Sequence, residues 1–216
     1  MSGPFRVLHV ASHQTNVGDG AVNTVIVERL RALADRPIEV TNADVVVDRT
    51  MLSARDFDEF DLVVVGGGGA ISAGASNDGC GLALPTTNTE LEKTSTRFAF
   101  IALGHNTFAG ETIRAPEQLT RTIRWAAERG HPFSVRNDGS LDRLRRDIGS
   151  VATSVVDVPD PGFFIGSAPR VPDESGRDDF VVLQVAGYQI AKRLPGRAPG
   201  RLLARVDGTG AERLIH

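Results

Sequence analysis

Short runs of apolar and β-branched residues alternate with helix-like patterns along most of this chain. FRVLHVA at residues 5–11 and RFAFIAL at residues 97–103 are two such runs, and each is followed by a polar loop. Continuous apolar strands of this kind are typical of a parallel sheet that is covered on both faces, so the pattern predicts a doubly wound, Rossmann-like α/β fold. The expected strands are residues 5–11, 43–48, 61–65, 97–103, 132–136, 154–158 and 179–187, and the expected helices are residues 20–34, 53–60, 115–130 and 138–149.

Composition narrows the class of protein. A net charge of −3 over 216 residues gives no electrostatic reason to expect a nucleic-acid partner. The single cysteine, Cys80, cannot form an internal disulfide, the first residues lack a signal-peptide pattern, and no run is apolar enough to span a bilayer. We therefore expect a cytoplasmic protein without a membrane span.

The sequence divides into three regions. Residues 1–166 carry the strand and helix patterns of one Rossmann-like domain, and residues 167–187 look like a connection and the start of an incomplete second domain. Residues 188–216 are rich in Gly, Pro and Arg, and residues 186–216 hold six basic and two acidic side chains. We expect an irregular basic tail there, either a flexible segment or a truncated or frame-shifted end.

Ligands of parallel α/β sheets bind outside the carboxyl ends of the strands, so the loops that follow strands are the informative ones. In the first, Asn16, Gly18 and Asp19 stand where a strand gives way to a helix, and the free N–H groups of a helix start attract anions. Asp19 can equally be a helix N-cap that needs no ligand.

Four glycines follow the strand at residues 61–65. Their backbone N–H groups, at Gly67, Gly68 and Gly69 in particular, can cradle a phosphate or a carboxylate. The G-x-G-x-x-G spacing of a dinucleotide site fails, because the third glycine position is occupied by Ser72. The loop therefore favours an anionic ligand other than NAD, and the alternative is a tight turn that packs closely against a helix.

Two further loops carry side chains suited to catalysis or binding. His105 follows the strand at residues 97–103 and is a candidate proton donor, although a lone histidine is more often structural. Arg136 ends a strand, where a guanidinium can hold a phosphate or carboxylate through two hydrogen bonds. Asp138 and Ser140 begin the next helix and are either further ligand contacts or, with Asp138 paired to Arg136, a simple helix cap.

In this order, NVGDGAV, DLVVVGGGGAI, FSVRNDGSLDRL and VPDPGFFI resemble the motifs of the polysaccharide pyruvyl transferase family. The resemblance implies a GT-B-like pair of Rossmann-like halves, of which this chain carries the N-terminal one. It also implies transfer of a pyruvyl group from phosphoenolpyruvate to two hydroxyls of a sugar, with phosphoenolpyruvate as the donor substrate and no resident cofactor. Arg136 would contact the donor, Asn16 and Asp19 would line the cleft, and Gly67, Gly68 and Gly69 would form its floor.

The chain also departs from the family. Asn137 and Gly139 stand where acidic residues are common, and the pattern of a full second domain ends after Gly187. Two alternatives therefore stay open: a non-catalytic ligand-binding module, and half of a nucleotide-sugar glycosyltransferase. The expected partners are phosphoenolpyruvate and a saccharide acceptor, with self-association through an exposed domain face. No His, Cys or Asp spacing predicts a metal site.

Overall fold

The computed structural model describes residues 3–13, 17–46, 50–74, 78–107 and 111–166. They form a six-stranded sheet in which every neighbouring pair is parallel, in the order β2-β1-β3-β4-β5-β6. The strands are β1 (Phe5–Ala11), β2 (Ile38–Asp44), β3 (Leu62–Ser72), β4 (Arg97–Asn106), β5 (Phe133–Arg136) and β6 (Val156–Val158). The α/β, Rossmann-like fold class is thereby confirmed.

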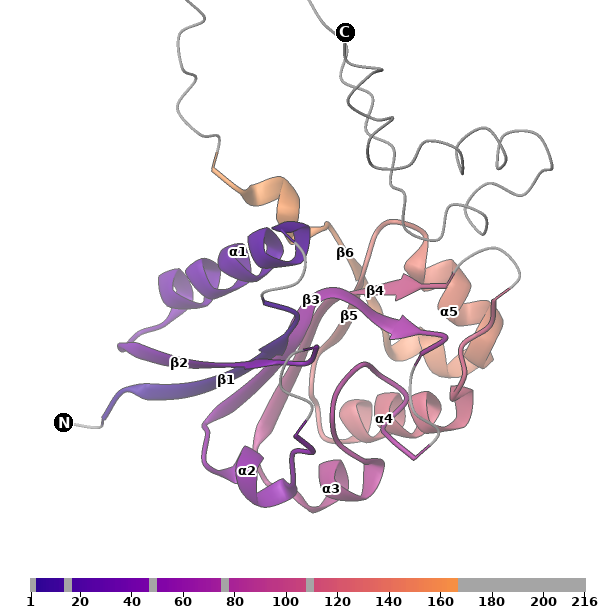
Figure 1. Cartoon of the computed structure of the whole chain (residues 1–216), viewed down its shortest axis with the longest axis horizontal. Helices are drawn as coiled ribbons and strands as arrows, with labels where there is room; N and C mark the ends of the chain where they lie inside the picture. The colour runs from indigo at the N-terminus through magenta and orange to yellow at the C-terminus, as the bar shows by residue number, and fades with distance from the viewer. Residues whose placement is uncertain (1–2, 14–16, 47–49, 75–77, 108–110, 167–216) are drawn as a thin grey trace, which may run out of the picture. The chain divides into compact units, whose positions relative to one another are not determined.

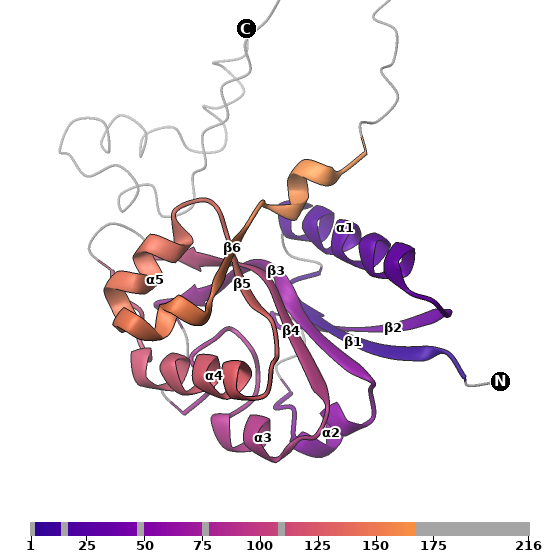
Figure 2. The ribbon, with the colours of Figure 1, turned by 180° about the vertical axis from the view of Figure 1, so that it is seen from behind.

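The helices connect successive strands. They are α1 (Val17–Leu33), α2 (Ala54–Asp58), α3 (Asn88–Lys93), α4 (Pro116–Glu128) and α5 (Ser140–Ile148), with 3-10 turns η1 (Gly149–Ser154) and η2 (Pro161–Phe164). Figures 1 and 2 show α1 on one face of the sheet and α2, α3 and α4 on the other. This follows from right-handed crossovers, because the chain moves outward from β1 to β2 and then turns back towards β3 and β4.

Each face of the sheet has its own apolar core. Beneath α1, Val22 and Ile26 pack on Val7 and Val64 of the central strands, and we call this side the α1 face. The larger core lies on the opposite side and joins α2, α4 and α5 through Phe57, Leu119, Leu144 and the aromatic residues of β4. Alternate residues of β1 and β3 therefore enter different cores, as the two-residue period of a strand requires.

The strand order places a topological switch point between β1 and β3. The connection that leaves β1 runs through α1 on one face, while the connection that leaves β3 runs to α3 on the other face. The loops at the carboxyl ends of β1 and β3 therefore diverge, and a crevice at this position is where open α/β sheets bind ligands. The order also differs from the 3-2-1-4-5-6 order of dinucleotide-binding sheets.

Two helices have boundary residues that are typical of helix ends. Ser53 is the N-cap of α2, and it forms a capping box with Asp56. Pro116 is the first residue of α4, and Gly130, just beyond its end, has a positive φ of 68°. Local sequence chemistry therefore determines these helix boundaries.

Two predictions of element boundaries were wrong, and one helix was missed. The second strand, expected at residues 43–48, lies at Ile38–Asp44, because Asp44 ends it by accepting hydrogen bonds from the backbone N–H groups of Val46 (2.8 Å) and His13 (2.9 Å). The glycines after residue 65 belong to β3 itself, which continues beside β4 as far as Ser72. Helix α3 was not predicted at all.

The remaining expectations concern residues 167–216. The strand at residues 179–187, the connection at residues 167–187 and the tail at residues 188–216 lie outside the described residues. Within the described part of the chain, no helix has the length and apolar character needed to cross a membrane.

Candidate functional site

Helix α1 lies against the glycines of β3 at the switch point. Asp19 lies in the first turn of α1, and its Oδ1 is 3.0 Å from the position that a Cβ on Gly68 would occupy. A Cβ on the neighbouring Gly67 would collide with the side-chain amide of Asn23, also on α1. Gly67 and Gly68 have φ values of 81° and 129°, which side-chain-bearing residues rarely adopt. Glycine is therefore required here both by the backbone conformation and by the closeness of α1.

Asn23 was missed by the sequence reasoning. It is 3% exposed within the otherwise apolar buried face of α1, and its Nδ2 donates a 2.8 Å hydrogen bond to the carbonyl of Ser12. This bond ties the helix to the chain leaving β1. A polar residue among the apolar positions of a helix was the signal available for it.

Arg136 extends from the carboxyl end of β5 across β4. A Cβ on Gly104 would collide with its Nη2 and would lie 2.8 Å from its Cζ, so the guanidinium occupies the space that a side chain at residue 104 would fill. Gly68 pairs with Leu103 in the register of β3 and β4, next to Gly104. Asp19, Gly67, Gly68, Gly104 and Arg136 are thus linked across three strands, and we call this set the rim.

Two carboxylates hold the guanidinium of Arg136. Its Nη1 lies 3.2 Å from Oδ2 of Asp160, and its Nη2 lies 3.5 Å from Oδ2 of Asp138. Asp160 is itself fixed as the N-cap of η2, because its Oδ1 accepts a 2.8 Å hydrogen bond from the backbone of Gly162. Asp160 and Arg136 are 24 positions apart, and no local sequence pattern predicts that they pair.

Asp138 and Ser140 extend this network into the sheet. Both the backbone N–H and the hydroxyl of Ser140 donate to Oδ1 of Asp138. The same hydroxyl accepts a 2.8 Å hydrogen bond from the backbone N–H of His105. Ser140 is fully buried. Through these hydrogen bonds it joins the turn after β5 to the end of β4.

His105 faces the other side of the sheet from Arg136. Its Nε2 lies 2.6 Å from Oδ2 of Asp147 on α5, and the hydroxyl of Thr107 lies 3.2 Å from its Nδ1. The side chain is only 2% exposed. Successive residues of a strand point to opposite faces, so His105 joins the α5 side while Gly104 opens to the α1 face.

The other predicted site residues have simple placements. Gly18 lies with Asp19 in the first turn of α1. Gly69 lies against Asn106, since a Cβ on this glycine would come within 2.6 Å of the Asn106 Cβ. Asn16 lies outside the described residues. The structure thus places Asp19 against Gly68 and Arg136 over Gly104. The His105 side chain lies on the other face of the sheet, although its backbone N–H bonds to Ser140.

The rim can bind an anion and accept protons. Arg136 supplies a permanent positive charge and up to five N–H donors, while Asp19, Asp138 and Asp160 supply carboxylates nearby. Within the described ranges, no group of three or more His, Cys, Asp or Glu side chains is placed to hold a metal ion. Neither a scan against protein-family models nor a search of curated proteins finds a match for this chain.

Proposed function

We propose that this protein is a polysaccharide pyruvyl transferase-like protein that transfers a pyruvyl group from phosphoenolpyruvate to a sugar. The proposal rests on one observation: on the α1 face, Asp19 lies against Gly68 of β3 and Arg136 lies over Gly104 of the neighbouring β4. Phosphoenolpyruvate is proposed as the donor because the order of the four sequence motifs resembles that of the polysaccharide pyruvyl transferase family. A second Rossmann-like half facing the rim, as in GT-B-like enzymes, is part of the proposal.

The reaction assigns distinct tasks to the rim. Two sugar hydroxyl oxygens form bonds to C2 of phosphoenolpyruvate, the bond from C2 to the phosphate oxygen breaks, and C3 takes up a proton to become a methyl group. The two hydroxyl protons balance the methyl proton and the proton carried by the released phosphate. A cation must hold the donor, and a base must receive a hydroxyl proton.

Arg136 suits the first task. Asp160 accepts a hydrogen bond from its Nη1, and Asp138 forms an ion pair with its Nη2. A guanidinium has five N–H donors, so further donors serve a ligand oxygen. A planar guanidinium held in this way presents a fixed charge to a phosphate or carboxylate. Asp19 suits the second task, because its carboxylate lies against Gly68 at the crevice. The catalytic role of His105 stays a sequence prediction.

Purified protein mixed with phosphoenolpyruvate and a β-galactoside or N-acetylmannosamine acceptor tests the proposal. We expect saturable donor binding and, where the protein is active, ketal formation with stoichiometric phosphate release. Arg136→Ala should abolish donor binding. Arg121→Ala is the matched control, because Arg121 is also an ion-paired arginine but lies on α4 and pairs with Glu92. Equal donor affinity in wild type and Arg136→Ala would contradict the site.

The same assays separate the alternatives. Donor binding without any ketal would favour the non-catalytic module. Stabilisation by UDP- or GDP-sugars in a thermal-shift titration, with none by phosphoenolpyruvate, would favour the glycosyltransferase half and reject the pyruvyl donor.

A further inference from the structure

Gly104 is the glycine of β4, and its conformation does not require glycine. Its φ does not fall among the positive values found at Gly67, Gly68 and four other glycines of the described chain. An alanine there would meet no backbone strain. The three atoms nearest to the added methyl group all belong to the Arg136 side chain: Nη2, Cζ and Nε.

Two other glycines of the fold show the contrast. A Cβ on Gly66 would come within 2.6 Å of the carbonyl oxygen of Ile101, and one on Gly81 would collide with the backbone of Leu119. Those obstacles are main-chain atoms that cannot move without disturbing the sheet or α4. At Gly104 the obstacle is the end of a flexible side chain, so displacement of the guanidinium can relieve the clash with an added methyl group.

We propose that Gly104 is the positioning residue for Arg136. By lacking a side chain it lets the guanidinium lie over β4 at Gly104, where Asp160 holds its Nη1. This inference rests on the proposed function, because it concerns the same donor site. It gives Gly104 a role in ligand binding that is separable from stability.

Gly104→Ala is the direct test. We expect its urea midpoint to stay at the wild-type value and its affinity for phosphoenolpyruvate to fall at least about tenfold, the loss expected when a charge-assisted contact is removed. Gly74→Ala is the control, since the nearest atom to its added Cβ, Oγ of Ser72, is 3.6 Å away. It should match wild type in both measurements.

Chemical rescue gives a readout that a purely structural glycine would not affect. In Arg136→Ala the space above Gly104 is vacated, so millimolar ethylguanidine should restore part of the phosphoenolpyruvate binding. In the double variant Gly104→Ala/Arg136→Ala the methyl group has room, and the protein should fold. Ethylguanidine should fail to restore binding in this double variant, because the methyl group occupies the space that the Arg136 guanidinium fills in wild type.

The outcomes are distinguishable. If Gly104→Ala binds phosphoenolpyruvate with wild-type affinity, the role of Gly104 is overturned and the proposed function still stands. The same holds if ethylguanidine restores binding equally in the single and double variants. A large loss of stability in Gly104→Ala also overturns it, since the glycine would then be structural. Absence of donor binding by wild type rejects the proposed function and this inference together.

Discussion

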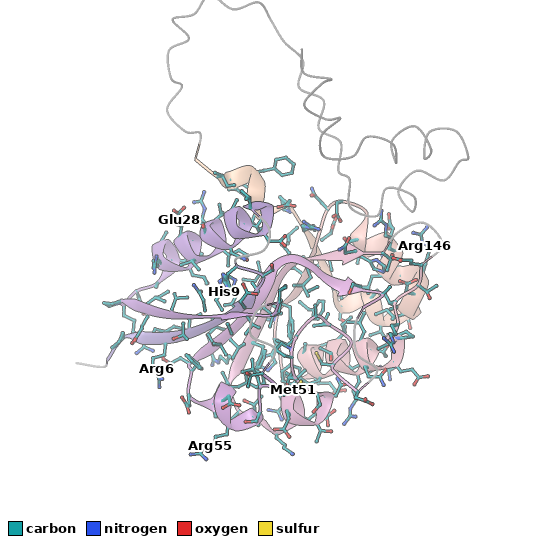
Figure 3. The ribbon with its side chains drawn as sticks, in the orientation of Figure 1. Arg6, His9, Glu28, Met51, Arg55 and Arg146 are labelled. Atoms are coloured by element: carbon teal, nitrogen blue, oxygen red, sulfur yellow. The ribbon has the colours of Figure 1, made fainter. Side chains whose placement is uncertain are left out.

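His9 lies in the middle of β1 with its side chain fully buried on the α1 face, and Figure 3 shows it between the sheet and α1. Burial, and then the charge of nearby His13, lower its pKa from 6.5 to about 4. The folded protein therefore keeps His9 neutral at a pH where the unfolded chain protonates it. At neutral pH the residue is a core histidine, as expected of a histidine within a strand.

This difference predicts a pH dependence of stability. Because the folded pKa is depressed, the stabilisation is complete above about pH 6.5 and is lost as the pH falls towards 4. We expect wild type to lose about 2 kcal/mol more unfolding free energy than His9→Asn between pH 7 and pH 5. Urea denaturation of both proteins at each pH measures it. Parallel curves for the two proteins would show that burial of His9 has no such cost.

Individual side chains were predictable from the sequence where their partners are close in the chain. Asp138 beside Arg136 is one case, and Ser53 with Asp56 is another. The contacts of Arg136 with Asp160 and of Gly68 with Asp19 join residues on separate elements, so their geometry exists only after the sheet has formed. His105 shows the reverse: its position after a strand was predicted, but the face on which it lies depends on strand alternation.

At the level of elements, the short helix α2 depends on its capping box. The Ser53 hydroxyl accepts from the backbone of Asp56 (3.4 Å), while the Asp56 carboxylate accepts from the backbone of Ser53 (2.8 Å). Next in the chain, Asp58 accepts hydrogen bonds from Thr94, Ser95 and Thr96 just before β4. The end of α2 is therefore connected to the start of a central strand.

Ser53→Ala should destabilise the protein by about 1 kcal/mol, the usual cost of losing a side-chain N-cap. Thermal or urea unfolding measures it. Ser150→Ala is a suitable control, because Ser150 is exposed and its hydroxyl takes part in none of the hydrogen bonds of the described structure. If both variants lost the same stability, the capping box would not be responsible.

The ends of strands were hardest to predict where pairing with a neighbouring strand, and not the local sequence pattern, determines them. Strand β3 runs on through its glycines because β4 continues to pair with it at Gly68 and Ile71. Strand β2 sits at the sheet edge with Glu39 and Thr41 exposed, so its sequence lacks the apolar run of a central strand. Both differences follow from the sheet and could not be read from either segment alone.

At the scale of the whole molecule, the strand order creates the binding position. Alternating strands and helices predict a parallel sheet, but several strand orders share the same alternation. The order β2-β1-β3-β4 puts the first turn of α1 next to the glycines of β3, and Arg136 lies over Gly104 of the neighbouring β4. Residues as far apart in the sequence as Asp19 and Asp160 therefore lie at one edge of the sheet.

The most direct test is an amide-resolved NMR titration of the protein with phosphoenolpyruvate. We predict saturable shifts at the backbone N–H groups of Gly18, Asp19, Gly67, Gly68 and Gly104, and their disappearance in Arg136→Ala. No saturable shift, or shifts confined to the Glu92 and Arg121 region of α3 and α4, would contradict the assignment of the rim as the donor site.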